Sequence, residues 1–127
     1  MLQDFPDADI AVSLIWIDML PTDNRKAAEK IAGGFQDPRL RHFHDPRTHL
    51  AGNAFRGDLV KRGPAWDIYL FYNKDAVWKD APPSPVEWWH QLGGGDRADP
   101  DRYAAGVLHE RLHESMHRVT GAKCIGE

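Results

Sequence analysis

Two apolar runs dominate the pattern of hydrophobic and polar positions along the chain. The run Ile10–Ile17 is nearly continuous and rich in β-branched residues, which predicts a strand covered on both faces, as in a parallel sheet under helices. The run Trp66–Tyr72 predicts a second strong strand. A shorter candidate strand, Arg39–His44, ends before Pro46, because proline cannot donate to a ladder. These three runs are the main strands of a predicted sheet.

Helix signals lie between these runs. Thr22 or Asp23 can cap a helix that continues to about Ile31 and stops at Gly33. The segment Thr48–Val60 is a weaker helix candidate because it contains two glycines and an asparagine. The first half of the chain is therefore predicted to alternate strand and helix.

The segment after the second strong strand predicts a hairpin and then a short helix. Residues Ala76–Trp78 can return beside that strand after a turn. Ser84-Pro85-Val86-Glu87 has the form of a capping box with proline at the first helical position. This motif predicts a helix over Val86–Gln91 that ends at the glycine run Gly93–Gly95.

The last predicted element is a helix near the C-terminus. Asp99-Pro100 is a second start signal, and the helix is expected to cover roughly Pro100–Val119 and to end at Gly121. Strands that alternate with helices in this way indicate an α/β sheet with right-handed crossovers.

Composition and charge narrow the class of protein. The chain has 127 residues, 42% hydrophobic and 28% charged, which suits one globular domain over residues 1–127. Its formal net charge is −3 without a basic block, so no nucleic-acid partner is predicted. The acidic start Met1–Asp9 does not resemble a secretory signal, and the longest apolar run is too short to span a bilayer. A cytoplasmic location without a membrane partner is expected.

One cysteine, Cys124, lies three residues before the end of the chain. A single cysteine forms neither an internal disulfide nor a Cys-x-x-Cys site. Its position predicts an incidental thiol on a frayed tail.

The element order resembles that of the thioredoxin-like superfamily. The resemblance rests on an apolar strand that ends in Trp16-Ile17-Asp18 and on Arg62-Gly63-Pro64-Ala65 before a later strand, and it covers roughly Asp9–Val119. The most similar branch has an extra strand and helix in the middle, as in thiol-disulfide oxidoreductases and peroxiredoxins. The resemblance implies an α/β three-layer sandwich, truncated or rearranged at the N-terminus, with about four strands and three to four helices. It also implies that Pro64 is a cis-proline; an ordinary trans turn proline is the alternative.

The chain departs from this family at the site of its chemistry. The family's first strand, and the Cys-x-x-Cys at the head of its first helix, have no counterpart here. Without those thiols there is no dithiol exchange, which implies a redox-inactive domain used for binding or assembly, or a truncated relative. In the family, the missing strand lies between the strands that match Ile10–Asp18 and Trp66–Tyr72. We therefore expect these two strands to pair directly, or a second copy to fill the space, unless the chain is a fragment. The expected partner is an unknown protein or a homodimer.

A second hypothesis rests on the histidines of the last predicted helix. His109-Glu110-Arg111-Leu112-His113 fits the H-E-x-x-H pattern, in which two histidines on one helix face bind zinc and the glutamate acts as general base. His117 adds a third imidazole one turn later. No residue occupies the position expected for the third ligand of a zinc peptidase. The alternatives are therefore an adventitious or structural metal site, or a solvated polar face. No cofactor is predicted under the first hypothesis, and zinc is predicted under the second.

Two further clusters are weaker candidates. His42 and His44 share one face of their predicted strand and, with His49, could bind metal together with Asp45 or with the histidines of the last helix. The alternative is a set of polar positions at a strand end. The run Trp88–His90 could present aromatic rings to a ligand, or it could pack on the core.

Overall fold

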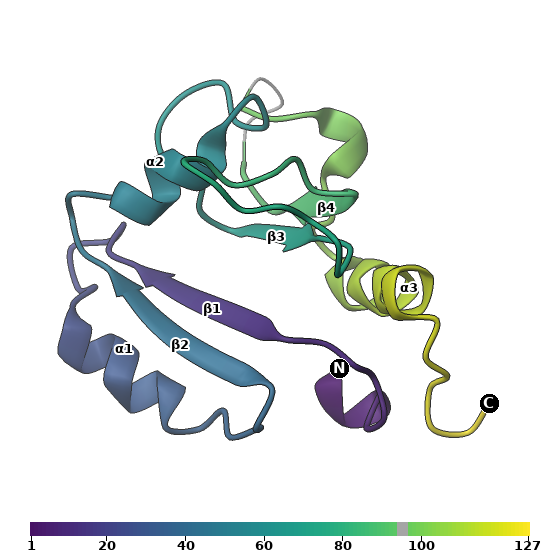
Figure 1. Ribbon diagram of the computed structural model, residues 1–127. Coiled ribbons are helices and arrows are strands. Elements are labelled where there is room, and N and C mark those ends of the chain that lie inside the picture. The colour runs from purple at the N-terminus through teal and green to yellow at the C-terminus, as the bar shows by residue number, and fades with distance from the viewer. Residues whose placement is uncertain (94–96) are drawn as a thin grey trace.

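The computed structural model describes residues 1–93 and 97–127, which form a mixed α/β fold with two separate two-stranded sheets (Figure 1). In chain order, the elements are the 3-10 turn η1 (Leu2–Asp4), β1 (Val12–Ile17), α1 (Arg25–Ala32), β2 (Leu40–Asp45), α2 (Leu50–Arg56), β3 (Ile68–Phe71), β4 (Glu87–His90), the 3-10 turn η2 (Pro100–Arg102) and α3 (Leu108–Thr120). Among the described residues, no helix is long and apolar enough to cross a membrane.

The first sheet is the parallel pair β1 and β2, joined through α1. Its register runs from Val12 opposite Leu40 to Ile17 opposite Asp45. The cap of α1 is Asn24, one residue after the predicted caps, and its Oδ1 atom accepts the Ala27 N–H at 2.9 Å. The predicted strands and helix of this unit are therefore confirmed, with boundaries shifted by one or two residues.

Burial of β1 differs from the expectation of a strand covered on both faces. Every residue of β1 is half-buried except Ser13, which is exposed. Half-burial at successive positions means that neither face of β1 is fully covered by the rest of the molecule. The prediction of full coverage is wrong.

The second sheet pairs β3 with β4 in antiparallel fashion, and it overturns two predictions. The helix expected over Val86–Gln91 is a strand, and β3 takes it as partner in place of the expected return at Ala76–Trp78. The Val86 N–H donates to the Phe71 carbonyl at 2.8 Å, so the capping-box segment begins a ladder. Two tryptophans in a row favour a pleated sheet, and cross-strand packing prevails over the local start signal. The predicted stop of that helix at Gly93–Gly95 lies largely outside the described residues.

The predicted helix Pro100–Val119 is divided into η2 and α3. Between them, Tyr103 forms a bridge with His90, and the Ala104 N–H donates to the His90 carbonyl at 2.9 Å. Gly106 then adopts a φ of +82°, which glycine reaches without strain. Pairing beside β4 therefore interrupts the helix. The predicted end at Gly121 is confirmed.

Two expectations drawn from the family resemblance are wrong. β1 and β3 belong to different sheets, so the strands that match Ile10–Asp18 and Trp66–Tyr72 do not pair directly. No peptide bond among the described residues is cis, so the bond before Pro64 is trans. A second copy that completes the sheet stays a prediction.

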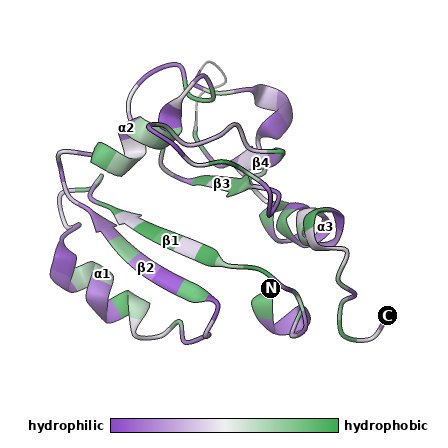
Figure 2. Ribbon diagram, viewed as in Figure 1, coloured by the Kyte–Doolittle hydropathy of each residue, from purple (hydrophilic) through white to green (hydrophobic). Residues whose placement is uncertain are grey.

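The apolar core is confined to the later part of the chain and the N-terminal turn. One cluster joins β3, β4 and α3 to the N-terminus and consists of Phe5, Ala8, Phe71, Trp89, Ala104 and Met116. A second cluster consists of Val60, Ala65, Leu92 and Ala98. Between Ala8 and Val60, by contrast, the only buried residues are Asp18, Asp45 and Gly52. Apolar residues are nevertheless abundant on β1 (Figure 2), so the β1–α1–β2 unit has apolar sequence without a buried core.

Arg39 ties the β1–α1–β2 unit to the N-terminal turn. Its guanidinium donates to the Phe5 carbonyl at 2.6 Å and to the Leu2 carbonyl at 3.0 Å. It also forms an ion pair with Asp37, and the hydrogen bonds from the Arg39 side chain and backbone N–H to that carboxylate lower the pKa of Asp37 to about 2. A few polar contacts thus hold this unit in place where apolar packing is thin.

The ion pair between Glu87 and Arg118 predicts a pH dependence of stability. The guanidinium hydrogen-bonds to the carboxylate, and this contact holds the pKa of Glu87 below its ordinary value of 4.5. A lowered pKa contributes stability that is present above pH 4.5 and is lost as pH falls through the folded-state value. We expect a Glu87→Gln variant to lose less stability than the wild type between about pH 5 and pH 3, measured by urea unfolding at each pH. Parallel pH curves for the two proteins would contradict this assignment.

Candidate functional site

The predicted histidines of α3 do lie along one flank of the helix. The ring centroids of His109 and His113 are 5.8 Å apart, and those of His113 and His117 are 5.3 Å apart. Phe5 packs against the second and third rings, with centroid distances of 4.6 and 4.9 Å. Glu110 is exposed to solvent. The helical spacing therefore brings the three imidazoles into one row.

Each of these imidazoles has a different partner. His109 is largely exposed, with Nε2 3.9 Å from the Asp4 carboxylate. His117 donates through Nδ1 to the Ala122 carbonyl at 2.9 Å, and its Nε2 lies 3.5 Å from the Glu127 carboxylate. Across residues 1–93 and 97–127, no three histidine, cysteine, aspartate or glutamate side chains are grouped so that they could hold a metal ion. The row therefore does not converge on one point, as the predicted zinc site at His109, His113 and His117 would require.

The cysteine differs from the expectation of an incidental thiol on a frayed tail. The Sγ atom of Cys124 lies 3.2 Å from Nε2 of His113, and the side chain is half-buried against the core cluster. The tail is held to the N-terminal turn by the Ile125 N–H, which donates to the Asp4 carbonyl at 2.9 Å, and within the tail the Cys124 N–H donates to the Glu127 carboxylate at 3.2 Å. Cys124 follows His113 by only 11 residues in the sequence. Their contact depends on the turn at Gly121, which reverses the chain after α3 and which the spacing alone does not predict.

A second polar cluster lies at the carboxyl ends of β1 and β2. The Asp18 carboxylate is 2.9 Å from Nε2 of His44, and Nε2 of His49 is 2.7 Å from the Asp18 carbonyl. His49 adopts a left-handed φ of 52°, a conformation that is uncommon for residues other than glycine. Asp45 faces elsewhere, and its carboxylate accepts the Gly52 N–H at 2.8 Å. Sequence reasoning grouped the histidines correctly but missed Asp18, whose only signal was its place directly after an apolar strand.

His42 belongs to the same sheet face but is occupied on both nitrogens. The indole N–H of Trp16 can only donate, so Nδ1 of His42 accepts it at 3.1 Å. Nε2 therefore carries the proton and donates to the Phe35 carbonyl at 3.1 Å. A metal ion at His42 would have to replace one of these bonds. No hydrogen bond or ion pair within the described part of the chain links this cluster to the histidines of α3.

The aromatic run Trp88–His90 is explained by packing. The Trp89 indole N–H donates to the Ser115 hydroxyl at 2.9 Å inside the core, and the side chain is nearly fully buried. His90 donates through Nε2 to the Asp99 carbonyl and accepts the Leu92 N–H through Nδ1. With both ring nitrogens bonded, this imidazole is structural. The run therefore does not present a ligand site.

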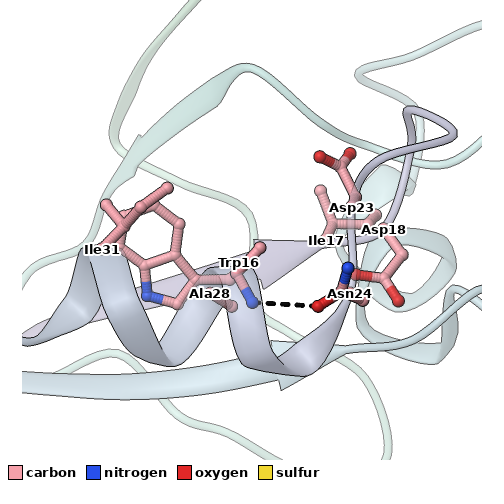
Figure 3. Close-up of a pocket in the computed structure, with 8 residues that line it drawn as sticks. Trp16, Ile17, Asp18, Asp23, Asn24, Ala28 and Ile31 are labelled. Carbon is pink, nitrogen blue, oxygen red and sulfur yellow. Dashed lines mark hydrogen bonds between the residues drawn. The ribbon is translucent and has the colours of Figure 1, made fainter.

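A small pocket, about 70 Å³ in volume, opens between β1 and α1 beside the Asp18 cluster. Figure 3 shows Trp16 and Ile31 at one end of it and Asp18, Asp23 and Asn24 gathered at the other. Asp23 is already bonded to the backbone N–H groups after β1, and Asn24 is the cap of α1. The pocket has room for a few water molecules, and the polar side chains Asp23 and Asn24 at one end already hydrogen-bond to the backbone.

Comparison of the chain with family models, with curated proteins and with solved structures finds no match. Function is therefore inferred from the contacts of this structure and from the resemblance seen in the sequence.

Proposed function

We propose that this chain is a redox-inactive thioredoxin-like domain that acts in assembly and extends its β1–β2 sheet with the same sheet of a second copy. One observation carries the proposal: residues 12–45 contain no buried apolar side chain, and Phe43 on β2 is 51% exposed. Parallel sheets are normally covered on both faces, and an isolated pair of strands is marginally stable. A surface that covers this unit would therefore stabilise it.

The cysteine content of the chain supports a role other than dithiol chemistry. The family that the chain resembles places its Cys-x-x-Cys at the head of its first helix. That helix has no counterpart here, and the one cysteine of the chain is Cys124. Binding and assembly are the uses of such a domain that need no dithiol.

The free edge of β2 can be identified from its hydrogen bonds. Val12 N–H donates to the Arg39 carbonyl, and Asp18 N–H donates to the Asp45 carbonyl. Odd-numbered residues of β2 therefore face β1, and the main-chain groups of His42 and His44 point to the opposite edge. In the described residues, β2 has no strand neighbour on that edge. The edge is a template for a further strand.

A second β2 strand fits this edge in an antiparallel register centred on Phe43. His42 of one copy then lies opposite His44 of the other, so the outward N–H and C=O groups pair. Phe43 lies opposite its own counterpart, which covers both half-exposed rings.

Proline ends this ladder on both sides. Pro38 and Pro46 flank β2 and have no N–H to donate. The added ladder is therefore limited to about five residues, which implies a small interface and a reversible dimer.

Cysteine cross-linking tests both the dimer and its register. In a Cys124→Ser background, a Phe43→Cys variant is expected to form a disulfide-linked dimer on mild oxidation. Residues directly opposite in a non-hydrogen-bonded antiparallel pair have Cα atoms about 4.5 Å apart, within the range of a disulfide. His42→Cys is the matched control, because in this register it faces His44 and should stay monomeric. Mass analysis under non-reducing conditions measures the fraction of disulfide-linked dimer in each variant.

Sedimentation over a range of concentrations provides the second measurement. The wild type should associate as concentration rises, and Phe43→Glu should abolish association because two carboxylates would meet at the centre of the ladder. Val77→Glu, at another exposed apolar side chain, should leave association unchanged. A wild-type monomer at every concentration, together with no preference for cross-linking at position 43, would overturn the proposal.

A further inference from the structure

The immobilised C-terminal thiol is not used by the assembly proposal. Cys124 is brought to His113 by the turn that follows α3, and the distance from Sγ to Nε2 is 3.2 Å. A nucleophile within hydrogen-bond reach of an imidazole is the arrangement by which proteins activate thiols. The contact joins α3 to the segment that follows it. The Ile125 N–H bond to the Asp4 carbonyl ties this segment to the N-terminal turn, and the Cys124 N–H donates to the Glu127 carboxylate.

The surroundings of the pair keep the imidazole oriented and the thiol accessible. The ring of Phe5, which is fully buried, packs against His113 at a centroid distance of 4.6 Å and fixes one side of the imidazole. The side chain of Cys124 is half-buried, and both neighbouring residues, Lys123 and Ile125, are exposed. Cys124 is therefore partly in contact with solvent while it contacts the imidazole of His113.

We propose that Cys124 is a modification site that forms a mixed disulfide with low-molecular-weight disulfides, with His113 as the proton acceptor. The thiol proton moves to Nε2 of His113, and Sγ attacks one sulfur of the small disulfide. The bond between the two sulfurs of that disulfide breaks as the new bond to Cys124 forms. The departing thiolate takes the proton back from the imidazolium. The protein thiol is oxidised, half of the small disulfide is reduced, and no other reactant is needed.

The single cysteine determines the outcome of this reaction. A second thiol in the same chain would resolve the mixed disulfide, but Cys124 has no such neighbour. The adduct therefore persists until an external thiol removes it. This chemistry modifies the protein and differs from dithiol exchange, which passes the disulfide on through a second cysteine.

Thiol kinetics with the neutral reagent 4,4′-dithiodipyridine test the proposal. We expect the second-order rate constant at about pH 6.5 to fall at least about tenfold in a His113→Ala variant. The difference should shrink at about pH 9.5, where an ordinary thiol ionises without help. His109→Ala, one turn away on the same helix flank, is the matched control and should react as the wild type does. Glutathione disulfide should add one glutathione to the wild type by intact mass and none to Cys124→Ser.

Either of two results would overturn the inference. The first is a His113→Ala rate equal to that of the wild type at about pH 6.5. If that variant fails to fold, the pH dependence of the wild-type rate constant provides the second test. A rate that follows pH in parallel with N-acetylcysteine amide would show that the imidazole takes no part.

Discussion

Replacing Phe5 with alanine is expected to lower the free energy of unfolding by about 3–5 kcal/mol, a large fraction of the stability of a domain of this size. Phe5 is fully buried, although it lies only four residues from the N-terminus, and it packs between β3, β4 and α3. Its loss would leave a cavity beside Met116 and would free the rings of His113 and His117. The backbone carbonyl that accepts from Arg39 would remain, so the measurement isolates the side chain.

Thermal and denaturant unfolding check this prediction. For a chain of this size, each kcal/mol corresponds to roughly 4 °C in melting temperature, so a fall of about 10–20 °C is expected. Phe35→Ala removes the same side chain from an exposed loop position and should cost less than about 1 kcal/mol. Equal losses in the two variants would show that the N-terminal turn does not contribute to the core.

Replacing Gly52 with alanine is expected to destabilise the protein by about 1–3 kcal/mol. A Cβ atom at this position would lie 2.7 Å from Cδ1 of Ile17 and 2.8 Å from Cβ of Pro64. Gly52 lies in α2, where alanine is intrinsically favoured over glycine by about 1 kcal/mol. A net loss would therefore show that the clash costs more than this intrinsic gain. The backbone of Gly52 also bonds Asp45 and Ala65, so any shift of α2 would strain both contacts.

Gly93 provides the control for that substitution. A Cβ atom added there meets none of the described residues within 4 Å, so Gly93→Ala should be neutral within about 0.5 kcal/mol. Urea unfolding of both variants gives the comparison. A Gly52→Ala variant as stable as the wild type would mean that β1, α2 and the loop at Pro64 do not approach each other as closely as the structure indicates.

Phe5 and Gly52 mark two of the places where the β1–α1–β2 unit joins the rest of the molecule. The N-terminal turn reaches it through Arg39, and α2 reaches it through Gly52. The unit has few other means of support, because it buries no apolar side chain. The proposed assembly through β2 would therefore stabilise the chain: a second copy that covers Phe43 should raise the melting temperature as concentration increases.

Local signals predicted the elements well where local and tertiary forces agreed. The apolar run at Ile10–Ile17 is rich in β-branched residues and forms β1, and the cap and glycine stop around 23–33 bound α1 to within one or two residues. The same reasoning failed at Val86–Gln91. There, a capping motif indicated a helix, but Trp89 gains more from burial between β3 and α3 than the backbone gains from helix formation. The last helix was shortened for a similar reason, by pairing of Ala104 with His90.

For the candidate sites, sequence spacing placed the histidines of α3 on one flank and His42 with His44 on one face. Spacing could not tell which atoms each ring would bind. His42 is occupied by Trp16 and Phe35, and His117 is occupied by Ala122. The contact of His42 with Trp16 joins segments far apart in sequence. The contact of His117 with Ala122 depends on a turn whose direction the sequence does not specify.

The sequence by itself determined the alternation of strands and helices in the first half of the chain, the absence of a dithiol, and the row of imidazoles on α3. These follow from periodicities of two and 3.6 residues and from residue identity, which act over a few positions. Only the tertiary structure decided the pairing of β3 with β4, the separation of β1 from β3, and the meeting of Cys124 with His113. Those outcomes depend on which apolar surfaces bury one another, a free energy summed over contacts that no short window of sequence contains.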